Sequence, residues 1–264
     1  MFETFTCMNK DVRLYCRRYG EGEPLILIHG ACVDSDFFTE MAEHLSKHFR
    51  VYTYDRRGCG RSDDTEGQHS LELLAEDAAC VLEHIGQSCH IVAHSAGTTI
   101  AARLALTYPE KIRSMILHEP VASDCLPEDS AQLSILREIC SLIEGGKYHR
   151  ELYKFLPLIG EGDSRARAAT KEELNHFEKN TDCFIVKEFD TIFFSRLDYN
   201  ALSKLGVPAY VGVGELSKGS GRWITAVNFA EKINARLVYF PGAHNCPYDL
   251  PKEFAWLVAG AILG

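Results

Sequence analysis

The sequence predicts an α/β fold in which helices flank a mainly parallel sheet and a helical lid is inserted after the sixth strand. Short apolar runs bounded by turn residues alternate with longer segments whose apolar residues recur at helical spacing. This alternation stops over 121–205, where helical patterns follow one another without a clear strand. We therefore expect a core made of residues 1–120 and 206–264 and a lid made of residues 121–205.

Strands are expected where apolar residues alternate or run together before a turn. Segment 12–19 alternates and ends at the turn sequence GEGEP. A continuous apolar run, which suits a strand buried on both faces, follows at 25–28, and further short strands are expected at 51–54, 89–93, 114–117, 209–214 and 237–240.

Helices are expected between these strands. In 71–85 the apolar residues recur every three or four positions, and Gly86 is a typical C-terminal cap. The other helical patterns cover 95–106, 131–143, 171–180, 222–234 and 250–262. Because strands joined by right-handed helical crossovers run parallel, the residues that follow them should gather at one edge of the sheet.

Composition and chain ends argue against several classes of protein. The 264 residues are 46% hydrophobic and 25% charged, as in ordinary globular chains, and a net charge of −9 disfavours nucleic acid. The N-terminus lacks the basic and apolar regions of a signal peptide. The longest apolar stretch, 255–263, is about half of a membrane span. We expect a cytoplasmic protein that binds neither nucleic acid nor membrane, and the sequence does not indicate an oligomeric state.

The ten cysteines are expected to be reduced thiols. No two stand as C-x-x-C, and a long chain without a signal peptide keeps its thiols reduced. Cys80, Cys89 and Cys140 lie within apolar patterns, so we expect small core residues there. No metal is predicted, because His44 and His48 lack a third ligand at helical spacing.

Serine and histidine follow two strands of the expected sheet. Ser95 stands between a strand and a helix in segment 93–97 (AHSAG), a sharp turn that would push its hydroxyl above the sheet. His244 follows the strand 237–240 and a Pro-Gly turn, where it could act as general base toward Ser95. The alternatives are an ordinary N-cap serine and a buried, hydrogen-bonded histidine.

These segments resemble those of the α/β-hydrolase fold superfamily. The similarity extends from about residue 12 to the C-terminus and rests on HG at 29–30, DRRGCGRS at 55–62, AHSAG at 93–97 and GAH at 242–244. The resemblance implies a nucleophilic serine, an oxyanion hole and the chain order serine, acid, histidine. It also implies that the backbone N–H groups of Ala31 and Ala96 are the oxyanion donors, and that no cofactor is needed.

The acid departs from the superfamily's common pattern. Members usually carry aspartate shortly after the strand that corresponds to 209–214, where this chain has Ser217. Glu119, directly after the preceding strand, is at the site that some hydrolases of this fold use instead. We favour Glu119, with Glu215 as the possible alternative acid. The other interpretations are a structural carboxylate for Glu119 and a solvated loop residue for Glu215.

A narrower similarity concerns the segments around the acid and the histidine, and it does not carry the substrate over, because the elbow and oxyanion segments differ. Segments 118–120 and 241–248 are similar to motifs of lactone hydrolases that act on zearalenone, which also take glutamate after this strand as the acid. Phe37 and Phe38, which follow the oxyanion loop, and His94 are expected to line the substrate pocket; the alternative for the two phenylalanines is core packing.

The expected activity is hydrolysis of a carboxylic ester or lactone of a small to medium, partly apolar substrate through an acyl-enzyme. Apolar lid residues at 156–159 and 193–194 would cap it. One alternative is a carbon–carbon bond or thioester hydrolase with the same triad, and another is a receptor-like ligand-binding module with a slow or inactive triad. Epoxide hydrolases and dehalogenases need aspartate in place of Ser95. A nucleotide site is disfavoured because 212–220 has neither the Gly-Lys-Ser/Thr of a phosphate loop nor the full G-x-G-x-x-G pattern.

Overall fold

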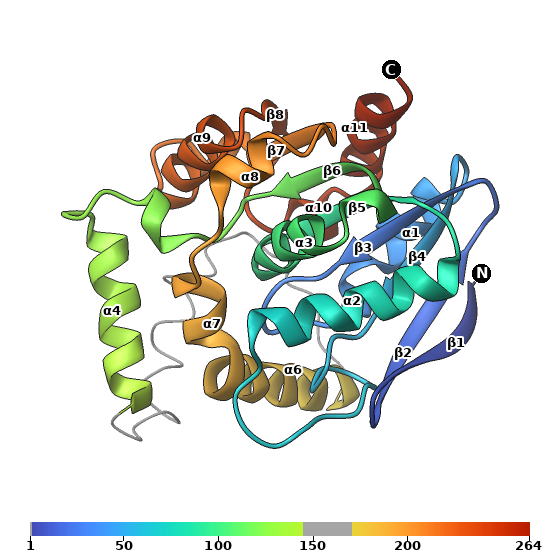
Figure 1. The fold of residues 1–264 in the computed structure, drawn as a ribbon, viewed down its shortest axis with the longest axis horizontal. Helices are drawn as coiled ribbons and strands as arrows, with labels where there is room; N and C mark the ends of the chain where they lie inside the picture. The colour runs from blue at the N-terminus through green and yellow to red at the C-terminus, as the bar shows by residue number, and fades with distance from the viewer. Residues whose placement is uncertain (1, 145–170) are drawn as a thin grey trace.

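A single eight-stranded sheet organises the protein, which we describe from a computed structural model over residues 2–144 and 171–264 (Figure 1). Its strand order is β1-β2-β4-β3-β5-β6-β7-β8. The strands are β1 (Phe2–Asn9), β2 (Val12–Tyr19), β3 (Glu23–Ile28), β4 (Phe49–Tyr54), β5 (Cys89–His94), β6 (Ile112–His118), β7 (Ala209–Gly214) and β8 (Arg236–Phe240).

The sheet is mainly parallel, as the alternation of strands and helices predicts. In the sheet order from β4 to β8 every neighbouring pair is parallel. The two antiparallel pairs are β1 with β2 and β2 with β4. Strand β1 is absent from the sequence-based expectation. It is an edge strand with a single buried residue, Cys7, and therefore lacks the apolar periodicity that predicts a strand.

Helices cover both faces of the sheet, so two apolar clusters form. One face packs against α2 (Leu71–Ile85), α3 (Ala96–Thr107) and α9 (Gly221–Lys232), and the other against α1 (Thr39–Leu45) and α11 (Pro251–Leu263) (Figure 1). Helix α2 shows why the local sequence forms a helix. The Ser70 side chain accepts a hydrogen bond from Leu73 N at its start, and Gly86 ends it at a φ of 74°.

Segment 121–205 is helical where the structure describes it. It contains η3 (Ser123–Cys125), α4 (Ala131–Glu144), α6 (Lys171–Cys183), the π-helical turn η5 (Phe184–Glu188), α7 (Phe189–Phe194) and α8 (Tyr199–Ser203). Phe184, Phe189 and Phe193 anchor it in the larger apolar cluster. Its role as a lid stays a prediction, and segment 156–159 lies outside the described residues.

The cysteines form no disulfide bonds in the structure. All ten cysteines are free; Cys89 is buried, whereas Cys80 and Cys140 are only partly buried and pack against the edge of the larger cluster. Across 2–144 and 171–264, no helix has both the length and the apolar character needed to cross a membrane.

Candidate active site

Ser95 lies on a strained turn between β5 and α3. Its φ of 51° is rare for a residue that carries a side chain. Two glycines allow the turn to be this tight. A Cβ on Gly97 would lie 2.4 Å from the carbonyl oxygen of Ile28, and a Cβ on Gly30 would lie 3.0 Å from Ser95 Cβ. The turn therefore brings the Ser95 hydroxyl to the edge of the sheet where the parallel strands end.

His244 contacts both Ser95 and a carboxylate. Its Nε2 lies 3.1 Å from Ser95 Oγ, and its Nδ1 lies 2.7 Å from Glu119 Oε2. The loop that carries His244 is fixed by His94, whose Nε2–H donates to the His244 carbonyl oxygen at 2.9 Å. Hydroxyl, imidazole and carboxylate thus form one hydrogen-bonded chain, although they come from three distant parts of the sequence.

The Glu119 carboxylate is held from two sides. Its Oε2 faces His244, while its Oε1 accepts from Gly214 N at 3.0 Å and from Ser217 Oγ at 2.5 Å. Burial by itself would raise the pKa of Glu119, but the hydrogen bond from His244, together with that from Ser217, outweighs burial and holds that pKa well below its usual range. Glu119 is therefore ionised, and Ser217, at the usual aspartate position, serves it as a hydrogen-bond donor.

Glu215, the alternative acid, takes a different place. It is exposed at the start of the short helix η6 (Glu215–Ser217). The Nδ1 position of His244 is filled by Glu119. Of the two candidate carboxylates, the structure brings Glu119 to the imidazole.

Burial keeps the imidazoles of the site neutral. Burial lowers the pKa of His244, and the charge of Arg222 lowers it further, against the opposing effect of Glu119. Arg222 Nε lies 3.8 Å from Glu119 Oε2. Burial also lowers the pKa of His118 to about 4 and that of His94 well below its ordinary value. At neutral pH His244 can therefore accept a proton.

A cavity of about 460 Å³ opens beside Ser95 and His244. Ala31 and Ala96 line it, next to the Ser95 side chain. Phe37 and His94, which the sequence analysis named for the substrate pocket, also line this cavity.

Phe38 is a correction to the predicted pocket. It is 1% exposed and belongs to the apolar cluster shared with α1 and α11, so it does not lie among the described lining residues. Phe37 and Phe38 are neighbours in the helical turn η1 (Ser35–Phe38), and neighbouring side chains of a helix point in different directions. The core-packing alternative therefore holds for Phe38.

Segment 121–205 supplies much of the cavity's apolar wall. Its contributions are Val121, Leu126, Leu136, Phe177, Phe184 and Phe193. Polar side chains also line the cavity, among them Gln132, Arg222 and Thr225. The sequence analysis did not identify Arg222 as a lining residue, nor the hydrogen bond from Ser217 to Glu119. The one signal for the loop that carries Ser217 was that serine stands there in place of the usual aspartate.

Two groups of potential metal ligands lie outside the cavity lining, among the described residues. The first is Asp34, Asp36 and His176, and the second is Asp64, His69 and Cys183. The Arg61 side chain already pairs with Asp34 and Asp36, at 3.7 and 3.1 Å. His44 and His48, considered from the sequence, belong to neither group.

Comparisons with known proteins agree with the fold. Residues 23–138 match the family model of the alpha/beta hydrolase fold. An uncharacterized hydrolase of Bacillus subtilis strain 168 is 28% identical over 89% of this chain and 87% of its own length. A pimeloyl-[acyl-carrier protein] methyl ester esterase of Aeromonas salmonicida is 31% identical over 57% of this chain and 59% of its own.

A solved structure extends the likeness of the fold to almost the whole chain. The bromoperoxidase from Bacillus anthracis superposes with a TM-score of 0.79, covering 99% of this chain and 100% of that one at 19% identity. At this identity the likeness concerns the fold alone. Together, the sheet topology, the match of residues 23–138 and the superposition show that the chain has the α/β-hydrolase fold.

Proposed function

We propose that this protein hydrolyses a carboxylic ester or lactone of a small to medium, partly apolar substrate through an acyl-enzyme. The observation that carries the proposal is the hydrogen-bonded chain from Ser95 through His244 to Glu119, with contacts of 3.1 and 2.7 Å, beside a largely apolar cavity. The Aeromonas relative, a methyl ester esterase, supports an ester as the bond that is cleaved.

The first half of the reaction forms the acyl-enzyme. Ser95 Oγ attacks the carbonyl carbon while its proton passes to His244 Nε2, 3.1 Å away. The imidazolium then gives this proton to the leaving alcohol as the carbon–oxygen bond of the ester breaks. Glu119 stabilises the positive imidazole and fixes the Nδ1–H tautomer through its 2.7 Å hydrogen bond.

Backbone N–H groups stabilise the negative charge that develops on the carbonyl oxygen. We assign this role to Ala31 and Ala96, which line the cavity beside Ser95. Ala96 is the first residue of α3, so the partial positive charge at the helix N-terminus acts in the same direction. One such donor is typically worth about 10²–10³ in rate.

The second half of the reaction releases the acid. A water molecule gives a proton to His244 Nε2 as its oxygen attacks the acyl carbon, and Ser95 leaves with the proton that His244 returns. The sum is one ester bond hydrolysed to an acid and an alcohol, or one lactone opened to a hydroxy acid. A thioester or a carbon–carbon substrate would use the same groups, so a substrate panel has to separate these classes.

A fluorophosphonate probe tests whether the serine is reactive. We expect stoichiometric labelling of the wild type, which Ser95→Ala abolishes, and turnover of p-nitrophenyl esters that depends on the same hydroxyl. Glu215→Gln is the matched control and should label like the wild type. If the folded wild type is not labelled and hydrolyses no ester, lactone or thioester, the proposal of an enzyme is refuted and the ligand-binding module is favoured.

A further inference from the structure

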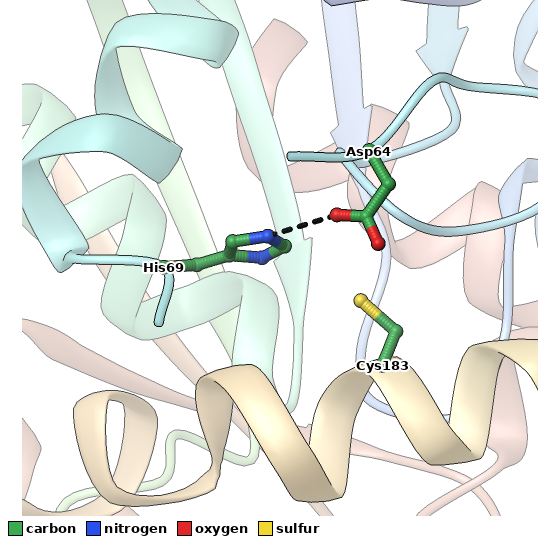
Figure 2. A group of neighbouring side chains, drawn as sticks. All are labelled: Asp64, His69 and Cys183. Carbon is green, nitrogen blue, oxygen red and sulfur yellow. Dashed lines mark hydrogen bonds and ion pairs between the residues drawn. The ribbon is translucent and has the colours of Figure 1, made fainter. Parts of the chain in front are cut away.

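A cluster of three different metal-ligating side chains lies away from the proposed catalytic site. Asp64 and His69 belong to the loop between β4 and α2, and Cys183 is the last residue of α6 (Figure 2). Their ligand atoms all lie within 4.8 Å of one another. Figure 2 shows the Asp64 carboxylate and the Cys183 sulfur approaching the same space from opposite sides, with the His69 ring beside them.

We propose that Asp64, His69 and Cys183 bind one divalent transition-type cation, of the chemistry of zinc. A thiolate, an imidazole and a carboxylate are the ligands that zinc takes in proteins. Magnesium and calcium prefer oxygen ligands throughout and do not suit this set. Bond lengths of about 2.0–2.3 Å in a tetrahedral site place ligand atoms roughly 3.4–3.6 Å apart, so small side-chain rotations close this cluster on an ion.

The surroundings of His69 are those of a metal-binding histidine. Its Nδ1 lies 3.3 Å from Glu188 Oε1, and its Nε2 is the atom turned toward Asp64, 3.0 Å from Oδ1. Both His69 and Glu188 are fully buried, and Arg56 pairs with Glu188 at 2.6 Å. A carboxylate on one ring nitrogen commonly orients the other nitrogen toward a metal.

Asp64 and Cys183 are likewise placed so that each can bind a cation through one atom, as a monodentate ligand. Lys187 Nζ holds Asp64 Oδ2 at 2.6 Å, which leaves Oδ1 toward the cluster. The Cys183 thiol donates a weak hydrogen bond to the Arg57 carbonyl oxygen at 3.8 Å, and a water molecule would complete the four ligands of the ion. When the cation binds, Cys183 loses its thiol proton to solvent, and the charges of thiolate and carboxylate balance those of the ion.

Such an ion would connect two parts of the chain. Asp64 and His69 lie before α2, while Cys183 lies in the helical segment that contributes Phe177 and Phe184 to the cavity wall. The site is therefore structural in kind, and its readout is metal binding and stability. It does not depend on the proposed hydrolysis, so failure of either proposal leaves the other intact.

Cobalt titration of the whole protein tests the site. Protein stripped with a chelator and kept reduced with a phosphine should bind one equivalent of Co²⁺, with a thiolate-to-cobalt charge-transfer band in the near ultraviolet that Zn²⁺ displaces and Mg²⁺ does not. Cys183→Ser should remove the band, whereas Cys140→Ser keeps it. Asp64→Asn should weaken binding, whereas Asp63→Asn leaves it unchanged. Glu188→Gln should weaken binding by about 10–100-fold.

Two results would overturn the proposal. One is the absence of stoichiometric binding by the folded wild type, which would leave a hydrogen-bonded and ionic network only. The other is a cobalt spectrum that survives both Cys183→Ser and Asp64→Asn, or that is lost on replacing His44, since the cation would then lie elsewhere. If Cys183→Ser does not fold, Asp64→Asn decides, because that side chain is 38% exposed.

Discussion

Replacement of Glu119 by glutamine is the sharpest test of the proposed triad. Glu119 Oε1 accepts two hydrogen bonds, from Gly214 N and Ser217 Oγ. In Glu119→Gln these two donors hold the amide oxygen on their side, so the amide NH₂ faces His244 Nδ1. That nitrogen must then accept, which moves the ring proton to Nε2. The base is left in the wrong tautomer, with its proton directed at Ser95.

The expected loss of activity in Glu119→Gln can be estimated from the contact between Glu119 and His244. A charge pair 2.7 Å apart is worth about 6 kcal/mol at an effective dielectric constant of about 20. Part of this is recovered when the imidazolium reorients, so we expect a loss of about 4–5.5 kcal/mol in transition-state stabilisation. This corresponds to about 10³–10⁴ in kcat. The assay is steady-state hydrolysis of a p-nitrophenyl ester at neutral pH.

Glu215→Gln is the matched control, because it removes a carboxylate in the same region from an exposed position. It should retain nearly full activity. The double variant Glu119→Gln with Ser217→Asp should regain part of the rate, since position 217 already reaches position 119 by hydrogen bond. If Glu215→Gln costs more activity than Glu119→Gln, the assignment of the acid is refuted.

Three further predictions follow from the site and the turn that carries it. Burial lowers the pKa of His244 below its ordinary 6.5, and the neutral imidazole is the active base. The rise of kcat/KM with pH should therefore be centred below pH 6.5. A midpoint above about pH 7 in the pH–rate profile would contradict this. Arg222→Gln removes a charge that lowers this pKa, so the same midpoint should move to higher pH, and an unmoved midpoint argues against the effect. Gly97→Ala places a Cβ 2.4 Å from the Ile28 carbonyl oxygen and should lower the free energy of unfolding by about 1–3 kcal/mol in urea titrations. The control is Gly260→Ala, whose added Cβ meets no atom within 4 Å, so it should not lower the free energy of unfolding.

The order of elements could be predicted from the sequence because its cause is local. Apolar periodicity marks helices such as 71–85, and short apolar runs mark the buried strands. The same logic puts Ser95, Glu119 and His244 at one edge of the sheet, since each follows a parallel strand. Strand β1 is not predicted from the sequence, because it forms by pairing along β2 and few of its side chains are buried.

Sequence alone determined which residues could take part in the site, and the tertiary structure decided which of them meet. Spacing left Glu119 and Glu215 both available, and only the packing of β6, β7 and the loop after β8 selects Glu119 for His244. Phe38 turns into the core although its neighbour Phe37 lines the cavity, and Cys183 joins His69 across more than a hundred residues. The physical reason is that periodicity records how each segment is buried, whereas contacts between segments depend on strand order and helix packing, which no short stretch of sequence contains.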